Sequence, residues 1–309
     1  MRHDVVILGV FVVDAAFRCD QMPKAGETRI GTGFTLGPGG KGSNQAVAAA
    51  RAGGAVGFIT RIGQDGFAAI ADQTWAEAGV APLVLRDAAR PTGAAGIFID
   101  DRSGENAIVI TPGAAGALTP ADVQSHAATI GQAKVIVTQL EQSIDAAETF
   151  LHLGAKAGAA TVLNPAPAAA IPDRILALCD YLTPNETEAT LLTGHPVGSA
   201  SEATVAAKML LARGVKRAVI VTLGEKGALI HDHQGSRIIP PFSAGPAIDT
   251  TGAGDAFNGA FATALAEGRD LDAALRFAMA AGALAVTKSG AAAAMPPRTA
   301  IDALLRTPA

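Results

Sequence analysis

The alternation of short apolar runs with longer alanine-rich stretches constrains this chain most strongly. Runs made almost wholly of apolar residues are typical of strands buried on both faces, and they occur at 5–8, 57–60, 135–139, 161–163, 181–183 and 219–223. The windows expected to be helices lie between or after them, at 66–78, 145–157, 202–213, 256–267 and 271–287. Strands that alternate with helices form βαβ units, so we expect an α/β fold with a doubly wound, mostly parallel sheet.

Two segments depart from this pattern, at approximately 14–33 and 93–110. In the second, the alternating runs 96–100 and 106–110 flank the polar turn Asp101-Arg102-Ser103-Gly104, which is typical of a hairpin. We therefore predict a small antiparallel β lid made by both segments. The length of 309 residues suits one large domain, so residues 1–309 are expected to form a single α/β unit that carries this lid.

The lid also predicts an assembly. Phe98, Ile108 and Ile110 would leave an apolar sheet face exposed, so we expect two lids to pack on each other in a homodimer.

Composition excludes several classes of protein. The net charge is −4 and only 4% of residues are aromatic, so no nucleic-acid partner is expected. Cys19 and Cys179 lie far apart, which argues against a disulfide scaffold or a zinc ribbon. The apolar run at 5–8 is far shorter than a membrane span of about 20 residues. We expect no membrane partner and a cytoplasmic location.

Three glycine clusters could hold phosphate, at 37–42, 222–227 and 252–255. The first is not a P-loop, because Lys41 is followed by Gly42 rather than by Ser or Thr. The third does not match a dinucleotide fingerprint, because Phe257 stands where a third glycine is needed. A dehydrogenase therefore remains only a distant alternative.

The third cluster predicts an anion site. Gly252-Ala253-Gly254-Asp255 runs directly into the helical window 256–267, so its backbone amides lie at a helix N-terminus. Glycine there allows the backbone to approach an anion closely. Asp255 could instead be an ordinary N-cap residue.

Five stretches, in the same order along the chain, resemble the ribokinases of the PfkB family of carbohydrate kinases: 39–46, 164–168, 183–188, 222–227 and 249–259. The resemblance implies a ribokinase-like fold and ATP-dependent phosphorylation of a sugar primary hydroxyl, with D-ribose converted to D-ribose 5-phosphate. Another pentose, a ketohexose or a nucleoside remains an alternative substrate. A non-catalytic sugar sensor is a further alternative, although a sensor would not need the acid at Asp255.

The resemblance also implies roles for individual residues. Asp255 would be the catalytic base, and Gly252, Ala253 and Gly254 would supply amides that stabilise charge on the transferred phosphoryl group. Sugar hydroxyls would be bound by carboxylates, amides and the backbone of one set of residues, which comprises Asp14, Gly40, Lys41, Asn44, Glu141 and Asp255.

The nucleotide and cation sites follow in the same way. ATP is the expected co-substrate, bound by Asn185, Thr222, Gly224, Lys226, Gly227 and Gly254. Mg²⁺ would lie near Glu188 and K⁺ near Asp249, Thr251, Ala285, Lys288 and Gly290. On local sequence alone, Asn185 and Glu188 also fit a helix capping box, and Lys226 fits a solvated turn.

Two positions depart from the family pattern. Val12 stands where ribokinases commonly carry Asn, two positions before Asp14, so the preferred sugar stays open. Ala294 stands where some ribokinases have Ser near the cation, so the strength of the K⁺ dependence also stays open.

Overall fold

A large sheet organises the structure, a computed structural model that describes residues 3–307. Within those residues, nine strands are arranged in the order β13-β12-β11-β10-β9-β8-β1-β4-β5. Their bounds are β1 (Val5–Leu8), β4 (Val56–Ile62), β5 (Ala81–Arg86), β8 (Val135–Thr138), β9 (Ala160–Leu163), β10 (Tyr181–Leu182), β11 (Ala218–Thr222), β12 (Ala228–Asp232) and β13 (Gly235–Ile239). The strands from β5 to β11 are parallel, and β12 and β13 continue the sheet as antiparallel neighbours.

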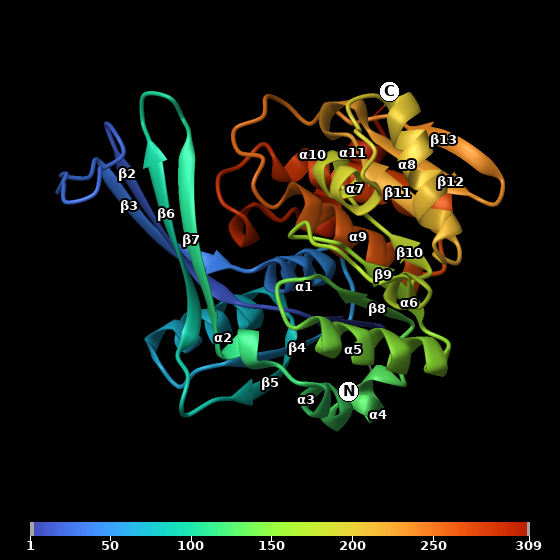
Figure 1. The fold of residues 1–309 in the computed structure, drawn as a ribbon, viewed down its shortest axis with the longest axis horizontal. Coiled ribbons are helices and arrows are strands. Elements are labelled where there is room, and N and C mark those ends of the chain that lie inside the picture. The colour runs from blue at the N-terminus through green and yellow to red at the C-terminus, as the bar shows by residue number, and fades with distance from the viewer. Residues whose placement is uncertain (1–2, 308–309) are drawn as a thin grey trace.

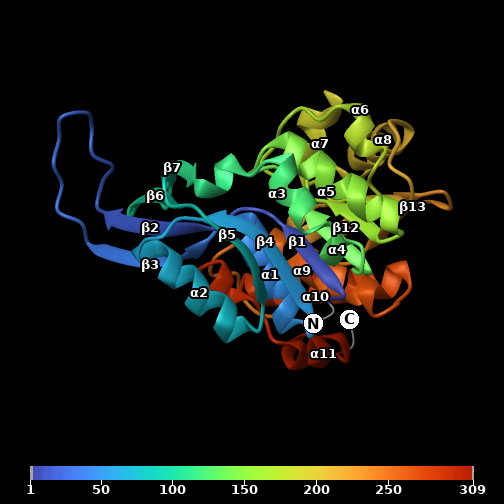
Figure 2. The same cartoon turned by 90° about the horizontal axis from the view of Figure 1, so that it is seen from below.

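Helices cover both faces of this sheet (Figures 1 and 2), which confirms the predicted doubly wound class. Val5 and Ile7 of β1 belong to one core cluster, together with residues of α1, α2, α9 and α10, whereas Val6 and Leu8 belong to the opposite one, with residues of α5 and α8. The helices are α1 (Lys41–Arg51), α2 (Gly66–Ala78), α3 (Pro120–Ser125), α4 (Ala127–Ile130), α5 (Ile144–Ala157), α6 (Asp173–Leu176), α7 (Glu186–Thr193), α8 (Ala200–Ala212), α9 (Ala253–Ala266), α10 (Leu271–Ala285) and α11 (Arg298–Leu305). Across residues 3–307, none of these is long and apolar enough to cross a bilayer.

Helix α1 was not among the expected helices. The glycine-rich stretch 37–42 suggested a loop, but Lys41 begins the helix, so Lys41 and Asn44 lie in its first turns. A Cβ on Gly42 would lie 2.6 Å from the Cα of Gly9, so the missing side chain lets the helix start pack directly on the segment after β1.

The lid is a separate four-stranded sheet that projects from the α/β body (Figures 1 and 2), in the order β3-β2-β6-β7. Its strands are β2 (Val12–Cys19), β3 (Gly33–Gly39), β6 (Thr92–Asp100) and β7 (Asn106–Gly113). The predicted hairpin around 101–104 is confirmed as β6 and β7. The first lid segment reaches Gly39 rather than ending at 33.

The expectation of a wholly antiparallel lid needs correction, because its two antiparallel hairpins are joined by a parallel pairing of β2 with β6. Strand β2 follows β1 in the chain and β6 follows β5, and these body strands belong to the parallel part of the large sheet. Both lid strands therefore leave the body in the same direction.

The pairing register divides the lid into two faces. Residues opposite one another in neighbouring strands share a face, and alternate residues along a strand point to opposite faces. The inner face carries Val12, Asp14, Ala95, Ile97, Ile108 and Ile110, and the outer face carries Phe17, Phe34, Leu36, Phe98 and Val109. Phe98 therefore lies on the face opposite Ile108 and Ile110, which corrects the prediction that these three residues form one apolar surface.

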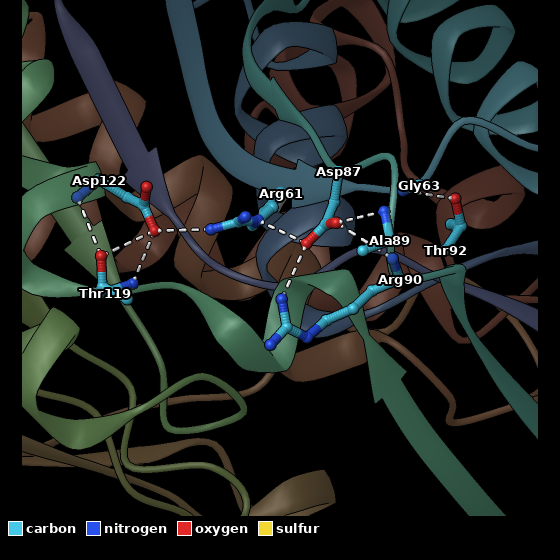
Figure 3. A network of polar contacts seen from close by, with 8 residues as sticks. All are labelled: Arg61, Gly63, Asp87, Ala89, Arg90, Thr92, Thr119 and Asp122. Atoms are coloured by element: carbon cyan, nitrogen blue, oxygen red, sulfur yellow. Dashed lines mark hydrogen bonds and ion pairs between the residues drawn. The ribbon is translucent and has the colours of Figure 1, made fainter.

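A polar network fixes the body beneath the lid (Figure 3). Arg61 in β4 donates to the carboxylates of Asp87 at 3.0 Å and Asp122 at 3.1 Å. Asp122 in turn closes a capping box with Thr119 at the start of α3. Thr92, the first residue of β6, accepts the amide of Gly63 at 3.0 Å. The end of β4, the turn that leads into β6, and α3 are thereby held together.

Candidate active site

The predicted site residues gather where the strand order reverses. From β1, the chain continues to β4 on one side of that strand and later to β8 on the other. Open α/β sheets bind ligands in the crevice outside the carboxyl ends of their strands at such a point. Glu141 follows β8, Asn185 follows β10, and Thr222 ends β11.

Asp255 lies at the centre of this crevice. Helix α9 has Gly252 as its N-cap, and Asp255 is the third residue of the helix, so the alternative that Asp255 is itself the N-cap is wrong. Its buried carboxylate accepts hydrogen bonds from Asn44 Nδ2 and Gln45 Nε2, both at 3.0 Å. Burial raises the pKa of Asp255, and the positive charge of Lys41 and these two hydrogen bonds oppose that rise.

The start of α9 offers backbone donors beside that carboxylate. Gly252 has φ +79°, and a Cβ there would lie 3.1 Å from Ala291, so the position requires glycine. The first bond of the helix is donated by Ala256 to the carbonyl of Gly252, which leaves the amides of Gly254 and Asp255 without a helical acceptor. The amide of Ala253, one of the predicted donors, already donates to Thr250 O at 3.3 Å, whereas the amide of Asp255 was not among the predicted donors.

A pocket of about 200 Å³ opens next to these amides. Seven predicted site residues line it, namely Lys41, Asn185, Glu188, Thr222, Gly252, Gly254 and Asp255. Five further residues complete the lining, namely Asn164, Ala166, Thr183, Thr250 and Asn258. Lys41, expected on the sugar side, therefore also reaches the pocket that contains Asn185 and Glu188.

Several buried polar residues of this pocket had no predicted role. Thr183 Oγ1 donates to Asn258 Oδ1 at 2.7 Å, and Asn258 Nδ2 donates to the carbonyl of Gly254 at 2.8 Å. Asn164 donates to the carbonyl of Thr183 at 3.1 Å. All three lie in the family-like stretches, which was the only available signal, because a single Asn or Thr carries no chemical pattern of its own.

The sugar-side residues come from both the body and the lid. Glu141 Oε2 accepts the amide of Lys41 at 2.8 Å, and burial raises the pKa of Glu141 to about 7. Asp14, which begins the first expected lid segment, lies on the inner face of lid strand β2. Burial raises its pKa to about 6. Asp14 lies against Gly39, where any Cβ would collide with its carboxylate.

Asn44 and Gly40 complete this side. Asn44 donates to Asp255, but its buried Oδ1 has no partner among the described residues, which leaves an acceptor for a hydroxyl group. Gly40 is the N-cap of α1 with φ +87°.

Asn185 and Glu188 form the capping box that local sequence suggested. Asn185 Oδ1 accepts the amide of Glu188 at 2.8 Å, and Glu188 Oε2 accepts the amide of Asn185 at 2.9 Å. Both side chains also line the pocket, so capping and pocket roles coincide. Burial raises the pKa of Glu188, the backbone hydrogen bond from Asn185 and the charge of Lys41 oppose this, and the charge of Asp255 adds to it.

Of the predicted nucleotide-loop residues, Thr222 lines the pocket and pairs with Asn185 in an isolated β-bridge. Gly224, Lys226 and Gly227 form the next turn of the chain and lie outside the pocket lining. Lys226 Nζ donates to Gly198 O at 3.4 Å in an exposed position. The solvated turn that was considered for Lys226 matches this geometry.

The residues expected around a monovalent cation are brought together. The carboxylate of Asp249 accepts the amides of Thr251 and Gly290, each at 2.9 Å. Burial raises the pKa of Asp249, but these hydrogen bonds outweigh it and hold the pKa below its usual value. Ala285 and Lys288 belong to the same segment, because the amide of Lys288 donates to Ala285 O at 3.2 Å.

Comparison with known proteins adds to this geometry. A profile of the pfkB family carbohydrate kinases matches residues 2–298. The chain is similar to a ribokinase of Haemophilus influenzae, with 40% identity over 299 residues that cover 96% of this chain and 97% of the relative. It is also similar to a deoxyribokinase of Salmonella typhi, with 37% identity over 295 residues and 95% of both chains covered.

Solved structures agree with the sequence comparison. The structure of Arabidopsis thaliana ribokinase complexed with ribose and ATP superposes over 100% of both chains, with a TM-score of 0.92 and 30% identity. Ribokinase from Giardia lamblia covers 99% of both chains, with a TM-score of 0.90 and 32% identity. On the strength of the profile match and the full-length relatives, this chain belongs to the pfkB family of carbohydrate kinases.

Proposed function

We propose that this carbohydrate kinase transfers the γ-phosphoryl group of ATP to the primary hydroxyl of D-ribose and forms D-ribose 5-phosphate. One observation carries the proposal. The buried carboxylate of Asp255 lies beside the backbone amides at the start of α9 and accepts a hydrogen bond from Asn44 Nδ2. The side-chain oxygen of Asn44, Oδ1, is buried without a partner among the described residues. The ribokinase relatives and the Arabidopsis complex with ribose and ATP support the choice of substrates.

Asp255 acts on the hydroxyl that attacks phosphorus. An ordinary aspartate has a pKa of about 3.9 and water one of about 15.7, so full deprotonation before attack is strongly uphill. The carboxylate therefore orients the hydroxyl and accepts its proton late, as the bond to phosphorus forms. The amides of Gly254 and Asp255 then stabilise charge on the moving phosphoryl group.

Sugar hydroxyls would be bound by polar atoms of both the lid and the body. Asp14 and Glu141 would offer carboxylate oxygens, Asn44 would offer its unpartnered amide oxygen, and Gly40 and Lys41 would line the site with their backbone. A buried polar atom left without a partner costs about 1–3 kcal/mol, so a sugar that lacks the matching hydroxyl binds more weakly.

A second candidate substrate is 2-deoxy-D-ribose, and Val12 favours it. Val12 shares the inner face of the lid with Asp14, and it packs in an apolar cluster with Val10 and Ala95. An apolar side chain at this position offers no hydrogen bond to a sugar hydroxyl. The deoxyribokinase of Salmonella typhi, at 37% identity, is a relative with the corresponding activity in its name.

Mg²⁺ and the phosphates of ATP would occupy the pocket. Glu188 is a single carboxylate in the pocket wall, and both of its oxygens already contact Asn185, so it would hold the ion through water. When bound, Mg²⁺ neutralises charge on the ATP phosphates. Asn185, Thr222 and Gly254 would lie along the phosphates, with Gly224, Lys226 and Gly227 further out toward the base.

K⁺ fits the segment around Asp249. A carboxylate beside backbone carbonyls is a donor set that suits a hard cation. Asp249 and the carbonyls of Thr251, Ala285, Lys288 and Gly290 would hold it, next to the start of α9. Ala294 offers no side-chain oxygen, so binding would depend on the carboxylate and the backbone.

Three proposals concern the whole chain. Residues 1–309 form one α/β domain with the lid as its subdomain. Two chains form a homodimer by packing the outer faces of their lids, since that face leaves Phe17 43% and Phe34 57% exposed. The cytoplasmic location expected from the sequence stays a prediction that cell fractionation would test.

An ADP-release assay tests the proposed function. The panel is D-ribose, 2-deoxy-D-ribose, other pentoses, fructose and nucleosides, each with and without K⁺. We expect the highest kcat/KM with ribose or 2-deoxyribose. Sugar binding without ADP release would identify a sensor, and thermal stabilisation by NAD but not by ATP would favour a dehydrogenase. Either of those two results would contradict the proposal.

A further inference from the structure

A second layer of buried amides lies directly behind Asp255. Gln45, in the second turn of α1, has no exposed surface. Its Nε2 donates to Asp255 Oδ1 at 3.0 Å and to Asn164 Oδ1 at 3.1 Å. Its Oε1 accepts a hydrogen bond from Gln139 Nε2 at 2.5 Å. Both polar atoms of the Gln45 amide therefore have partners, from three different elements of the fold.

The neighbours permit only one orientation of the Gln45 amide. Asn164 donates through Nδ2 to the carbonyl of Thr183, so its Oδ1 faces Gln45 and requires a donor. An ionised Asp255 also accepts only, and Gln139 supplies a donor from the other side. Rotating the amide of Gln45 by half a turn would bring oxygen against oxygen at Asp255 and at Asn164.

We propose that Gln45 is a positioning residue for the reaction. It holds Asp255 in one orientation and presents only a donor to it, with Gln139 and Asn164 fixing the amide from behind. Asn44 donates to the other oxygen, so Oδ1 and Oδ2 are each held by one amide. The inference rests on the proposed role of Asp255, and it extends that role to a fully buried residue that does not line the pocket.

Charged groups around Asp255 set the background for this effect. The positive charge of Lys41 favours the ionised form of Asp255. The negative charge of Asp255 in turn raises the pKa values of Glu141 and Glu188. Burial disfavours the charged form most strongly, so the donors from Gln45 and Asn44 oppose the largest effect. Removing the Gln45 donor should therefore make Asp255 take up its proton at a higher pH.

The first experiment measures this titration without any substrate. Protein labelled with [¹³Cγ]aspartate is titrated by carbon NMR, and the Asp255 signal is assigned by its loss in Asp255→Asn. In Gln45→Met and Gln45→Glu, we expect the Asp255 midpoint to rise by about one pH unit or more. Gln45→Glu raises it through a second carboxyl group, which must share a proton with Asp255.

Gln142→Met is the matched control. Gln142 is a buried glutamine of the same polar layer, but it donates to Thr138 Oγ1 at 2.8 Å and to Gln139 O at 2.7 Å and does not contact Asp255. Its loss should lower thermal stability and leave the Asp255 midpoint in place. Gln139→Leu removes the donor to Gln45 Oε1 and leaves that oxygen buried without a partner, so it should weaken the hold of the Gln45 amide on Asp255 and raise the midpoint. This variant covers the case in which the Gln45 variants fail to fold.

Kinetics provide the second measurement. With the preferred sugar, Gln45→Met should lower kcat by about tenfold or more and leave the KM for ATP unchanged. In the pH profile of kcat, the acid limb should move to higher pH. An Asp255 midpoint that is unchanged in Gln45→Met, Gln45→Glu and Gln139→Leu would overturn the inference, whatever their stability. If the wild-type protein releases no ADP with any sugar, the proposed function fails, and the NMR titration still decides the role of Gln45.

Discussion

Asp255 and Asp270 both stand at the start of a helix, but their carboxylates accept different donors. Asp270 caps α10 by accepting the amide of Ala273 at 2.8 Å, whereas Asp255 accepts side-chain amides from α1. We expect Asp255→Ala to lower kcat by about 100-fold or more, with ATP affinity nearly unchanged, because a positioned base is lost. The measurements are steady-state kinetics and ATP titration calorimetry.

Asp270→Ala is the control for that substitution. It should lower the free energy of unfolding by about 1 kcal/mol and leave kcat unchanged. If Asp255→Ala gave this same result, with a loss of kcat below about threefold, the assignment of Asp255 as the base would be wrong.

Substitution of Gly254 tests whether the start of α9 lies against the transferred phosphoryl group. A Cβ on Gly254 would meet nothing within 4 Å, and the residue lines the pocket, so an added methyl group would occupy space that the phosphate needs. We expect Gly254→Ala to lower kcat/KM for ATP by about tenfold or more while stability stays equal or rises, since alanine favours helix. Gly66→Ala, at the start of α2 with equally open space, should leave kcat/KM unchanged.

Glu141 predicts how stability depends on pH. Its folded pKa of about 7 lies above the value of 4.5 for a free glutamate, so the folded state binds more protons between these two values. The stabilisation is complete below about pH 4.5 and is lost as pH rises through about 7. In the protein without ligands, the free energy of unfolding should therefore fall by up to about 3 kcal/mol as the pH rises, and Glu141→Gln should remove that fall. Urea unfolding from pH 5 to 8 measures it. An equal slope in both proteins would contradict the pKa shift.

At the scale of elements, the lid is expected to close over the sugar. Asp14 lies on the inner face of β2, and Gly39 and Gly40 connect β3 to the start of α1, so sugar contacts reach both lid and body. We predict that ribose slows hydrogen exchange throughout β2, β3, β6 and β7, and that ATP hydrolysis without sugar is far slower than transfer with it. Protection limited to the surroundings of Glu141 and Asp255, or equal hydrolysis without sugar, would show that the lid does not gate the site.

The body of the fold was predictable because each buried strand and helix carries its own pattern. β1 was expected at its observed bounds, and α2 likewise. Helix α1 was missed because its start, Lys41-Gly42-Ser43-Asn44, has the composition of a loop. It is helical because Gly42 can pack against Gly9, a contact between residues 33 positions apart that no local pattern encodes.

The site was predictable only in part, and for the same reason. Asp255, Asn44, Glu141, Asn185 and Glu188 were found through stretches that resemble a family. Gln45 lay inside one of those stretches and was passed over. Its role depends on contacts with Gln139, which follows β8, and with Asp255 in α9, about 100 and 200 residues away in the chain. For a related reason, Phe98 was assigned to the same lid face as Ile108 and Ile110. The register between β6 and β7, which places Phe98 opposite Ala107, decides this, and no local pattern encodes it.

At the scale of the whole molecule, the outer face of the lid predicts the oligomeric state. Phe17 packs against Phe34 and Phe98, with ring centroids 4.9 and 5.9 Å apart, and all three stay partly exposed. We expect light scattering at micromolar concentration to show a dimer, and Phe17→Glu to convert it to a monomer, because a charge would be buried in the interface. Ile238→Glu, at an exposed apolar position on β13, should leave the dimer intact. A monomeric wild-type protein would contradict the proposed assembly.

The order of the strands also gives the site a direction. Gln139, Asn164, Thr183 and Thr222 stand at the carboxyl ends of β8, β9, β10 and β11, which are successive neighbours in the sheet. Adjacent strands lie about 4.8 Å apart, so this row extends over about 14 Å from the sugar end to the nucleotide end. Under the proposed function, the sugar and ATP would thus be contacted by residues that follow different strands. Substitutions beside β8 can change which sugar is accepted while the contacts to ATP beside β11 stay as they are, which provides a route by which one scaffold acquires new acceptors.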